Sequence, residues 1–102
     1  MHLIDTFNHT IEMYLNIRND FQINTYQTHF EVLSLNGTIC DDGTHLHIAL
    51  SDEDGKVIGG HVVSDLVVHT TMEVVLGESL DAKLSREYDQ KTGYNELVVK
   101  KL

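Results

Sequence analysis

Three of the seven histidines in this sequence have a spacing typical of a metal site. His45 and His47 lie two residues apart in the alternating segment His45–Leu50, and His61 follows a pair of glycines. Because strand side chains alternate between the two faces of a sheet, His45 and His47 share a face, with Cα atoms about 6.5–7 Å apart. Three neutral imidazoles with an open fourth position form the ligand set expected for zinc, at Zn–N distances of about 2.0–2.1 Å. We therefore interpret these three residues as a candidate zinc site; the competing interpretation is polar histidines on a solvated sheet face.

The loop between the two predicted strands decides whether His61 joins the other two histidines. A two-residue loop, Asp54-Gly55, would place His47 opposite Val62 and turn His61 to the wrong face. A three-residue loop, Glu53–Gly55 with its glycine in the left-handed conformation, would place His47 opposite His61. A bulge at the glycine pair before His61 could reset either register. Both loops are chemically plausible, so the sequence leaves this alternative open.

Two further residues could support a bound metal. Glu73 lies in the apolar segment Thr70–Val75, where a carboxylate needs a partner or a role. It could orient a ligand imidazole or carry protons for a metal-bound water. His69 lies four residues before Glu73 and so faces the same side of the predicted strand. It is the second candidate for supporting a bound metal, or it could be the partner of Glu73 itself. Cys40 has no spacing typical of a ligand. The sequence has neither a glycine-rich phosphate-binding loop nor a Gly-x-Ser-x-Gly elbow, so we assign no catalytic residues and no organic cofactor site.

The remaining sequence predicts mainly antiparallel β structure with little helix. Alternating or β-branched segments predict strands over the following ranges: Thr10–Arg18, Phe21–Tyr26, His29–Ile39, Thr44–Leu50, Lys56–Val63, Leu66–Leu76 and Glu96–Leu102. One segment, Glu78–Gln90, predicts a helix, because Leu80, Leu84 and Tyr88 recur four residues apart. These elements are expected to form a single domain over residues 1–102.

Composition limits the classes of function. The chain has 7 Lys plus Arg against 16 Asp plus Glu, a formal net charge of −9, and its cations are scattered. We therefore expect the isolated chain to bind duplex DNA no more tightly than about 10⁻⁵ M at physiological salt. A single cysteine excludes an internal disulfide and favours a cytoplasmic location. No apolar run approaches the roughly 18 residues of a membrane helix, so no membrane association is expected.

Several segments together resemble one known family, the PPC (plants and prokaryotes conserved) domain. They are Phe30–Ile39, His45–Asp52, Val57–His61, Thr70–Val75 and Tyr88–Tyr94. The resemblance implies an α/β (α+β) fold, a mainly antiparallel β-sheet with one or two flanking helices, assembled as a homotrimer. It also implies zinc on the His-x-His plus Gly-Gly-His pattern, which corresponds here to His45, His47 and His61.

Two features depart from that family. Plant members carry separate AT-hook motifs that grip the minor groove of DNA, and this sequence contains no Arg-Gly-Arg string. Family members also have an opening strand and helix before the strand that resembles Thr10–Arg18, for which this sequence has no room. We therefore expect either a shortened member or an incomplete copy, with exposed apolar sheet surface that oligomer contacts would cover.

Three interpretations of the function are consistent with these observations. The first is a DNA-binding or regulatory protein of the PPC type, a homotrimer that acts partly through protein partners and holds a three-histidine zinc site. The second is a small zinc-dependent enzyme that uses metal-activated water on an unknown small-molecule substrate. A purely structural metal site in an interaction module is a third interpretation. The sequence leaves enzymatic activity undecided.

Overall fold

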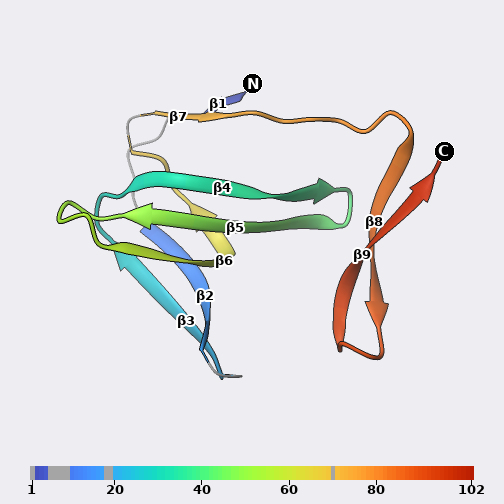
Figure 1. The fold of residues 1–102 in the computed structure, drawn as a ribbon, viewed down its shortest axis with the longest axis horizontal. Coiled ribbons are helices and arrows are strands. Elements are labelled where there is room, and N and C mark those ends of the chain that lie inside the picture. Colours follow the sequence, from blue (N-terminus) through green and yellow to red (C-terminus); the bar gives the residue numbers. More distant parts are fainter. Residues whose placement is uncertain (1, 5–9, 18–19, 70) are drawn as a thin grey trace. The chain divides into compact units, whose positions relative to one another are not determined.

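The computed structural model describes residues 2–4, 10–17, 20–69 and 71–102, and every regular element in these ranges is a β-strand (Figure 1). The strands are β1 (His2–Ile4), β2 (Thr10–Ile17), β3 (Asp20–Gln27), β4 (Glu31–Cys40), β5 (Gly43–Ser51), β6 (Val57–Leu66), β7 (Met72–Val74), β8 (Ala82–Asp89) and β9 (Tyr94–Lys101). The mainly antiparallel sheet predicted from the sequence is therefore confirmed.

Five strands form the main sheet, in the order β3-β2-β6-β5-β4. The pairs β2–β3, β2–β6 and β5–β6 are antiparallel. Strand β6 is the central strand of this sheet, with β5 on one side and β2 on the other (Figure 1). Strands β1 and β7 form a separate antiparallel pair. The β5–β6 pair is the part of the sheet that carries both the core and the histidines.

The core lies on one face of β5 and β6. Leu50 is completely buried and Ile48 is 5% exposed, and both alternate with residues that face the other way. The half-buried side chains that pack against this pair are Tyr26, Phe30, Leu35, Ile58, Val62 and Leu66. Burying a leucine or isoleucine side chain contributes about 1.5–3 kcal/mol, so this face anchors the orientation of β5. The odd-numbered residues of β5 therefore lie on the opposite face of the strand.

The loop between β5 and β6 is closed by the side chain of Asp52. Its carboxylate oxygen Oδ1 accepts hydrogen bonds from the backbone N–H groups of Asp54, at 2.9 Å, and Lys56, at 2.8 Å. The Asp52 N–H donates to the Lys56 carbonyl at 2.9 Å, and the Gly55 N–H donates to the Asp52 carbonyl at 3.1 Å. Gly55 has φ of 80°, a conformation that glycine adopts without steric cost. This is the three-residue loop, Glu53–Gly55, one of the two that the sequence allowed.

A second compact unit contains the β8–β9 hairpin together with residues 38–45, which include the β4–β5 turn. The backbone N–H of Arg86 in β8 donates to Asp42 Oδ2 at 2.9 Å, and its guanidinium donates to Thr38 Oγ1 at 2.6 Å. At the tip of the hairpin, Gly93 has φ of 79° and donates its N–H to the Asp89 carbonyl at 2.8 Å. Arg86 therefore serves as a structural link within this unit.

The helix predicted over Glu78–Gln90 is wrong, because Ala82–Asp89 forms strand β8, paired with β9 along its whole length. The prediction rested on Leu80, Leu84 and Tyr88, which recur every four residues. A spacing of four is close to one helical turn but is also a multiple of the strand period of two. The pattern could not separate the two structures, and pairing with β9 decided between them. The flanking helices expected from the family are likewise not found in the described ranges.

The single strand predicted over Leu66–Leu76 is also wrong. Strand β6 ends at Leu66, and the chain then leaves the main sheet. Only Met72–Val74 returns to strand structure, as β7 paired with β1. Strand β7 therefore pairs with a segment near the N-terminus. Local sequence patterns do not predict a pairing between segments so far apart in the chain. Arg18 and Thr70, which bounded two predicted segments, lie outside the described residues.

No helix in the described ranges is both long enough and apolar enough to cross a bilayer.

Replacing Asp52 by Ala should destabilise the protein by about 1–3 kcal/mol, because two backbone donors would lose a charged acceptor. Urea denaturation followed by circular dichroism measures the change in the free energy of unfolding. Asp54→Ala is the matched control, since it removes one carboxylate from the same loop and leaves both bonds to Asp52 Oδ1 in place. Equal destabilisation by the two variants would contradict this role of Asp52.

Candidate metal centre

The β5–β6 register places His47 directly opposite His61. Each step of the ladder follows from the loop: Ser51 pairs with Val57, and the pairing continues without a shift to the two histidines. The imidazole rings have centroids 5.4 Å apart and an interplanar angle of 67°. Because directly opposite residues of an antiparallel pair share a face, both rings lie on the side away from Ile48. The three-residue loop that the sequence left open is therefore the one that brings these histidines together.

His45 joins the pair through the strand itself, because it precedes His47 by two residues on β5. Nitrogen atoms of His45, His47 and His61 all lie within 4.8 Å of one another. The side chain of His47 is exposed, and those of the other two are half-buried. Tetrahedral zinc at about 2.0–2.1 Å from each nitrogen requires nitrogens about 3.3 Å apart. The three imidazole nitrogens lie close enough together to form a group that could hold a metal ion.

Gly59, two residues before His61, is required by the close approach of the two strands. A Cβ atom built at this position would lie 2.7 Å from the backbone carbonyl oxygen of Ile48. Real Cβ atoms do not approach a backbone oxygen so closely, so any larger residue would push β6 away from β5. Gly59 therefore permits the register on which the cluster depends.

Strand β2 lies on the other side of β6, and Tyr14 is the Cα partner of His61 there. His61 thus lies on β6, the central strand of the sheet, and His45 and His47 lie on the neighbouring strand β5. The sequence contained no signal that β2 would lie beside β6, because these strands are separated by three other strands along the chain.

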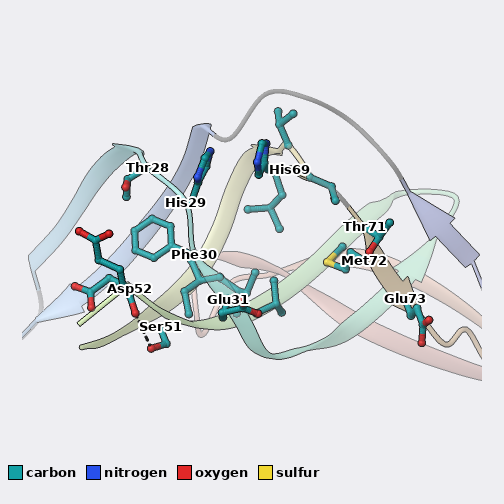
Figure 2. A pocket seen from close by; sticks show the side chains of 17 residues that line it. Thr28, His29, Phe30, Glu31, Ser51, Asp52, His69, Thr71, Met72 and Glu73 are labelled. Carbon is teal, nitrogen blue, oxygen red and sulfur yellow. Dashed lines mark hydrogen bonds between the residues drawn. The ribbon is translucent and has the colours of Figure 1, made fainter. Parts of the chain in front are cut away.

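Glu73 and His69, the predicted supporting residues, line a cavity of about 670 Å³ (Figure 2). The apolar part of its lining includes Ile48 and Leu50, which alternate along β5 with His47 and so belong to the other face of that strand. The ring of His69 stacks on that of His29, with centroids 3.9 Å apart and an interplanar angle of 13°. A role for Glu73 and His69 beside a metal stays a prediction.

The sequence analysis missed this cavity and the stacked pair within it. His29 lies between β3 and β4, and His69 follows β6, so no local spacing connects them. Only the return of the chain toward β7 brings the two segments together. Cys40, which had no ligand-like spacing, is a half-buried free thiol at the end of β4.

The chain belongs to the family of the Plants and Prokaryotes Conserved (PCC) domain, whose model matches residues 8–80. This is the family that the sequence segments resembled under the abbreviation PPC, and the prediction is confirmed. The matched range contains the β5–β6 hairpin with all three clustered histidines. It ends before β8, so the segment Tyr88–Tyr94 lies beyond it.

Relatives come from bacteria and plants. A protein named "Bifunctional protein GlmU" from Synechococcus sp. (strain JA-3-3Ab) is 44% identical over 72 residues, which are 71% of this chain and 12% of that protein. "AT-hook motif nuclear-localized protein 2" from Arabidopsis thaliana is 37% identical over 75 residues, which cover 66% of this chain and 22% of that protein. The chain therefore spans only a small share of the length of these relatives.

A solved structure has the same fold over most of the chain. It is a hypothetical protein from Salmonella cholerae-suis (Salmonella enterica), 36% identical in sequence, with a TM-score of 0.78. The similarity covers 90% of this chain and 67% of the Salmonella chain.

Replacing Gly59 by Ala should destabilise the protein by about 1–3 kcal/mol, because its methyl group would force a backbone shift between β5 and β6. Thermal denaturation measures the loss, and chemical shifts of the His47 and His61 rings report the change at the cluster. Gly77→Ala is the matched control, since a Cβ atom there meets no atom within 4 Å. A Gly59→Ala protein as stable as the control would contradict the close-approach argument.

Proposed function

We propose that this chain is a regulatory, DNA-associated PPC-domain protein that works as a homotrimer and binds one zinc ion per chain. The observation that carries the zinc assignment is the cluster of His45, His47 and His61, whose nitrogens lie within 4.8 Å of one another. Zinc is the metal proposed because three neutral imidazoles are a ligand set that suits it well. Bound zinc would tie β5 to β6 across the face opposite the core, and in this proposal its role is structural.

The regulatory part of the proposal is supported by the relatives. The Arabidopsis relatives are named for an AT-hook motif and for nuclear localisation. In the two Synechococcus relatives, both named "Bifunctional protein GlmU", the similar stretch makes up only 12% and 11% of a much longer protein. A domain that recurs inside proteins with such different names can serve different functions, so its role depends on what accompanies it. We therefore propose that protein partners supply the contacts that direct this chain to DNA.

Charge supports an indirect connection to DNA. The chain has a net charge of −9. The densest local group of cations lies in the β8–β9 hairpin, where Arg86 already bonds Thr38 and Lys100 pairs with Glu87 at 3.2 Å. These two cations contribute less to neutralising phosphates, because Arg86 is engaged within its own unit and Glu87 offsets the charge of Lys100.

The homotrimer is supported by exposed apolar side chains on the β8–β9 hairpin. By register, Tyr88, Leu97 and Val99 lie on one face of it, and Val99 is 59% exposed. A two-stranded hairpin buries little of its own surface and is marginally stable alone. An apolar face of this kind is typical of a contact between protein subunits. We propose that it packs against another copy of the chain.

Two smaller proposals complete this picture. Residues 1–102 act as one domain, because strands β4 and β5 contribute residues to both compact units. The location is cytoplasmic, because the one cysteine is a free thiol, as expected in a reducing compartment.

A small zinc-dependent enzyme is the second candidate function. The cluster found among the described residues has three ligands, and zinc with three protein ligands keeps a fourth position for water in catalytic sites. In that case the metal would lower the pKa of its bound water, as it does in zinc hydrolases generally. The exposed side chain of His47 would leave that position accessible to a substrate. X-ray absorption at the zinc edge separates the candidates, since a coordinated water favours catalysis and a closed shell favours structure.

Metal analysis of untagged protein purified without chelator should give one zinc per chain. Replacing His47 by Ala should reduce zinc affinity by about two orders of magnitude or more, because His47 lies between the other two ligands. His29→Ala is the control, since it removes a histidine outside the cluster. Zinc affinity should also fall as the solution is acidified, because a protonated imidazole can no longer ligate the metal. Protein without zinc, or equal losses in both variants, would overturn the assignment.

Light scattering at micromolar concentration should give about three times the 11.6 kDa mass of one chain. Val99→Lys should shift the mass toward the monomer, because a buried lysine would have to lose its water without a partner. Val75→Lys is the matched control, as Val75 is 83% exposed and lies outside the hairpin. A wild-type mass of one chain would remove the trimer, and a Val99→Lys trimer would remove this interface.

In a gel-shift assay at physiological salt, the isolated chain should bind duplex DNA no more tightly than about 10⁻⁵ M, near ordinary non-specific affinity. The physical reason is the repulsion between a chain of net charge −9 and the phosphate backbone. Sub-micromolar binding that distinguishes AT-rich from GC-rich duplexes would contradict this prediction. Lys83→Ala and Lys91→Ala would then show whether the cations of the hairpin are responsible.

A further inference from the structure

The cavity lined by His69 and Glu73 is large enough to hold a small molecule. Its volume of about 670 Å³ falls within the usual range of ligand pockets, roughly 300–1,000 Å³. Its apolar lining includes three buried side chains, Ile48, Leu50 and Val68. Figure 2 shows Phe30 and Asp52 toward one end of it and Met72 and Glu73 toward the other. An apolar floor of this size could cover the body of a small organic molecule.

The polar part of the lining is acidic. Four carboxylates line the cavity: Glu31, Asp52, Glu53 and Glu73. One oxygen of Asp52 accepts two hydrogen bonds within the β5–β6 loop, whereas the other three side chains are exposed at the rim. No lysine or arginine is among the described residues that line this cavity. The local charge therefore has one sign, in a chain that is already strongly negative.

The stacked rings of His29 and His69 add a flat wall to the same cavity (Figure 2). Their interplanar angle of 13° keeps the two rings nearly parallel. Phe30, which follows His29, contributes an aromatic ring to the lining, held edge-on against Tyr26 at a centroid distance of 5.9 Å. The face of a phenylalanine ring attracts cations through its quadrupole, so Phe30 suits the same kind of ligand as the acidic rim, and the stacked histidine rings add a flat surface for its body.

We propose that this cavity binds a small organic cation, a flat apolar body that carries an ammonium or guanidinium group. The body packs on the floor of Ile48, Leu50 and Val68, and the cationic group lies near the exposed carboxylates of the rim. Anionic ligands such as nucleotides are disfavoured, because no cation of the lining would compensate their charge. The site is separate from the histidine cluster, which lies on the other face of β5, and it does not depend on the zinc or DNA proposals.

Two probes with the same ring and opposite charge test the proposal. Tyramine carries an ammonium group, and 4-hydroxyphenylacetate carries a carboxylate on a similar phenol body. Titration of isotope-labelled, full-length protein, followed by amide chemical shifts, should show tyramine binding with shifts at Phe30, His69 and Met72. The anionic probe should cause no such shifts at the same concentration. Equal binding of both probes, or no shifts with about 10 mM tyramine, would overturn the proposal.

A charge-matched pair of variants separates a site from general attraction to an acidic chain. The double variant Glu31→Gln and Glu73→Gln should weaken tyramine binding by about fivefold, because two carboxylates leave the rim. The control, Glu78→Gln with Glu96→Gln, removes two exposed carboxylates that do not line the cavity. Its affinity for tyramine should equal that of the wild type. All four substitutions are exposed, so folding is preserved and is checked in the same spectra. Equal weakening by both variants would reduce the binding to non-specific attraction and overturn the site.

Discussion

The hydrogen bonds from the Asp54 and Lys56 N–H groups to the Asp52 carboxylate hold together the β5–β6 hairpin, which carries the histidine cluster and the core. They close a three-residue loop, and the loop length determines which residue of β6 faces which residue of β5. A change of one residue in that loop would exchange the faces of the whole second strand, because the side-chain period of a strand is two. His47 would then oppose an apolar residue, and the core side chains of β6 would turn toward solvent. The loop register and the core therefore depend on each other.

The two faces of β5 have different tasks in consequence. The even-numbered residues Ile48 and Leu50 form the core and the floor of the cavity. The odd-numbered His45 and His47, with His61 opposite, form the cluster that could hold a metal ion. Gly59 lets the two backbones approach closely enough for both faces to form. A rigid, buried strand that carries a ligand set on its outer side is a better support for a metal than a loop would be, because its residues have little freedom to move apart.

The family match covers the sheet and the histidines but ends before the β8–β9 hairpin. The hairpin forms its own unit with the β4–β5 turn, held by the bonds of Arg86 to Asp42 and Thr38. The proposed contact between chains rests on the apolar face of this hairpin, where Tyr88 and Val99 are exposed.

Much about this protein was determined by local sequence patterns. The strands β2, β4, β5 and β6 were predicted because alternation and β-branched residues report a pleated strand directly. The shared face of His45 and His47 was predicted for the same reason, as it depends only on the period of one strand. The segments that carry the family resemblance were likewise sufficient to predict the family.

Other features were decided by tertiary structure, because they depend on which segments become neighbours. Leu80, Leu84 and Tyr88 fit a helix and a strand equally well, and pairing with β9 selected the strand. His61 lies beside the other histidines only if the three-residue loop forms. The hydrogen bonds from backbone N–H groups to Asp52 close that loop rather than the two-residue one. The stack of His29 on His69 and the cavity beside it join segments that lie far apart along the chain. Spacing within a segment carries no information about such contacts, since only the folded chain brings the segments together.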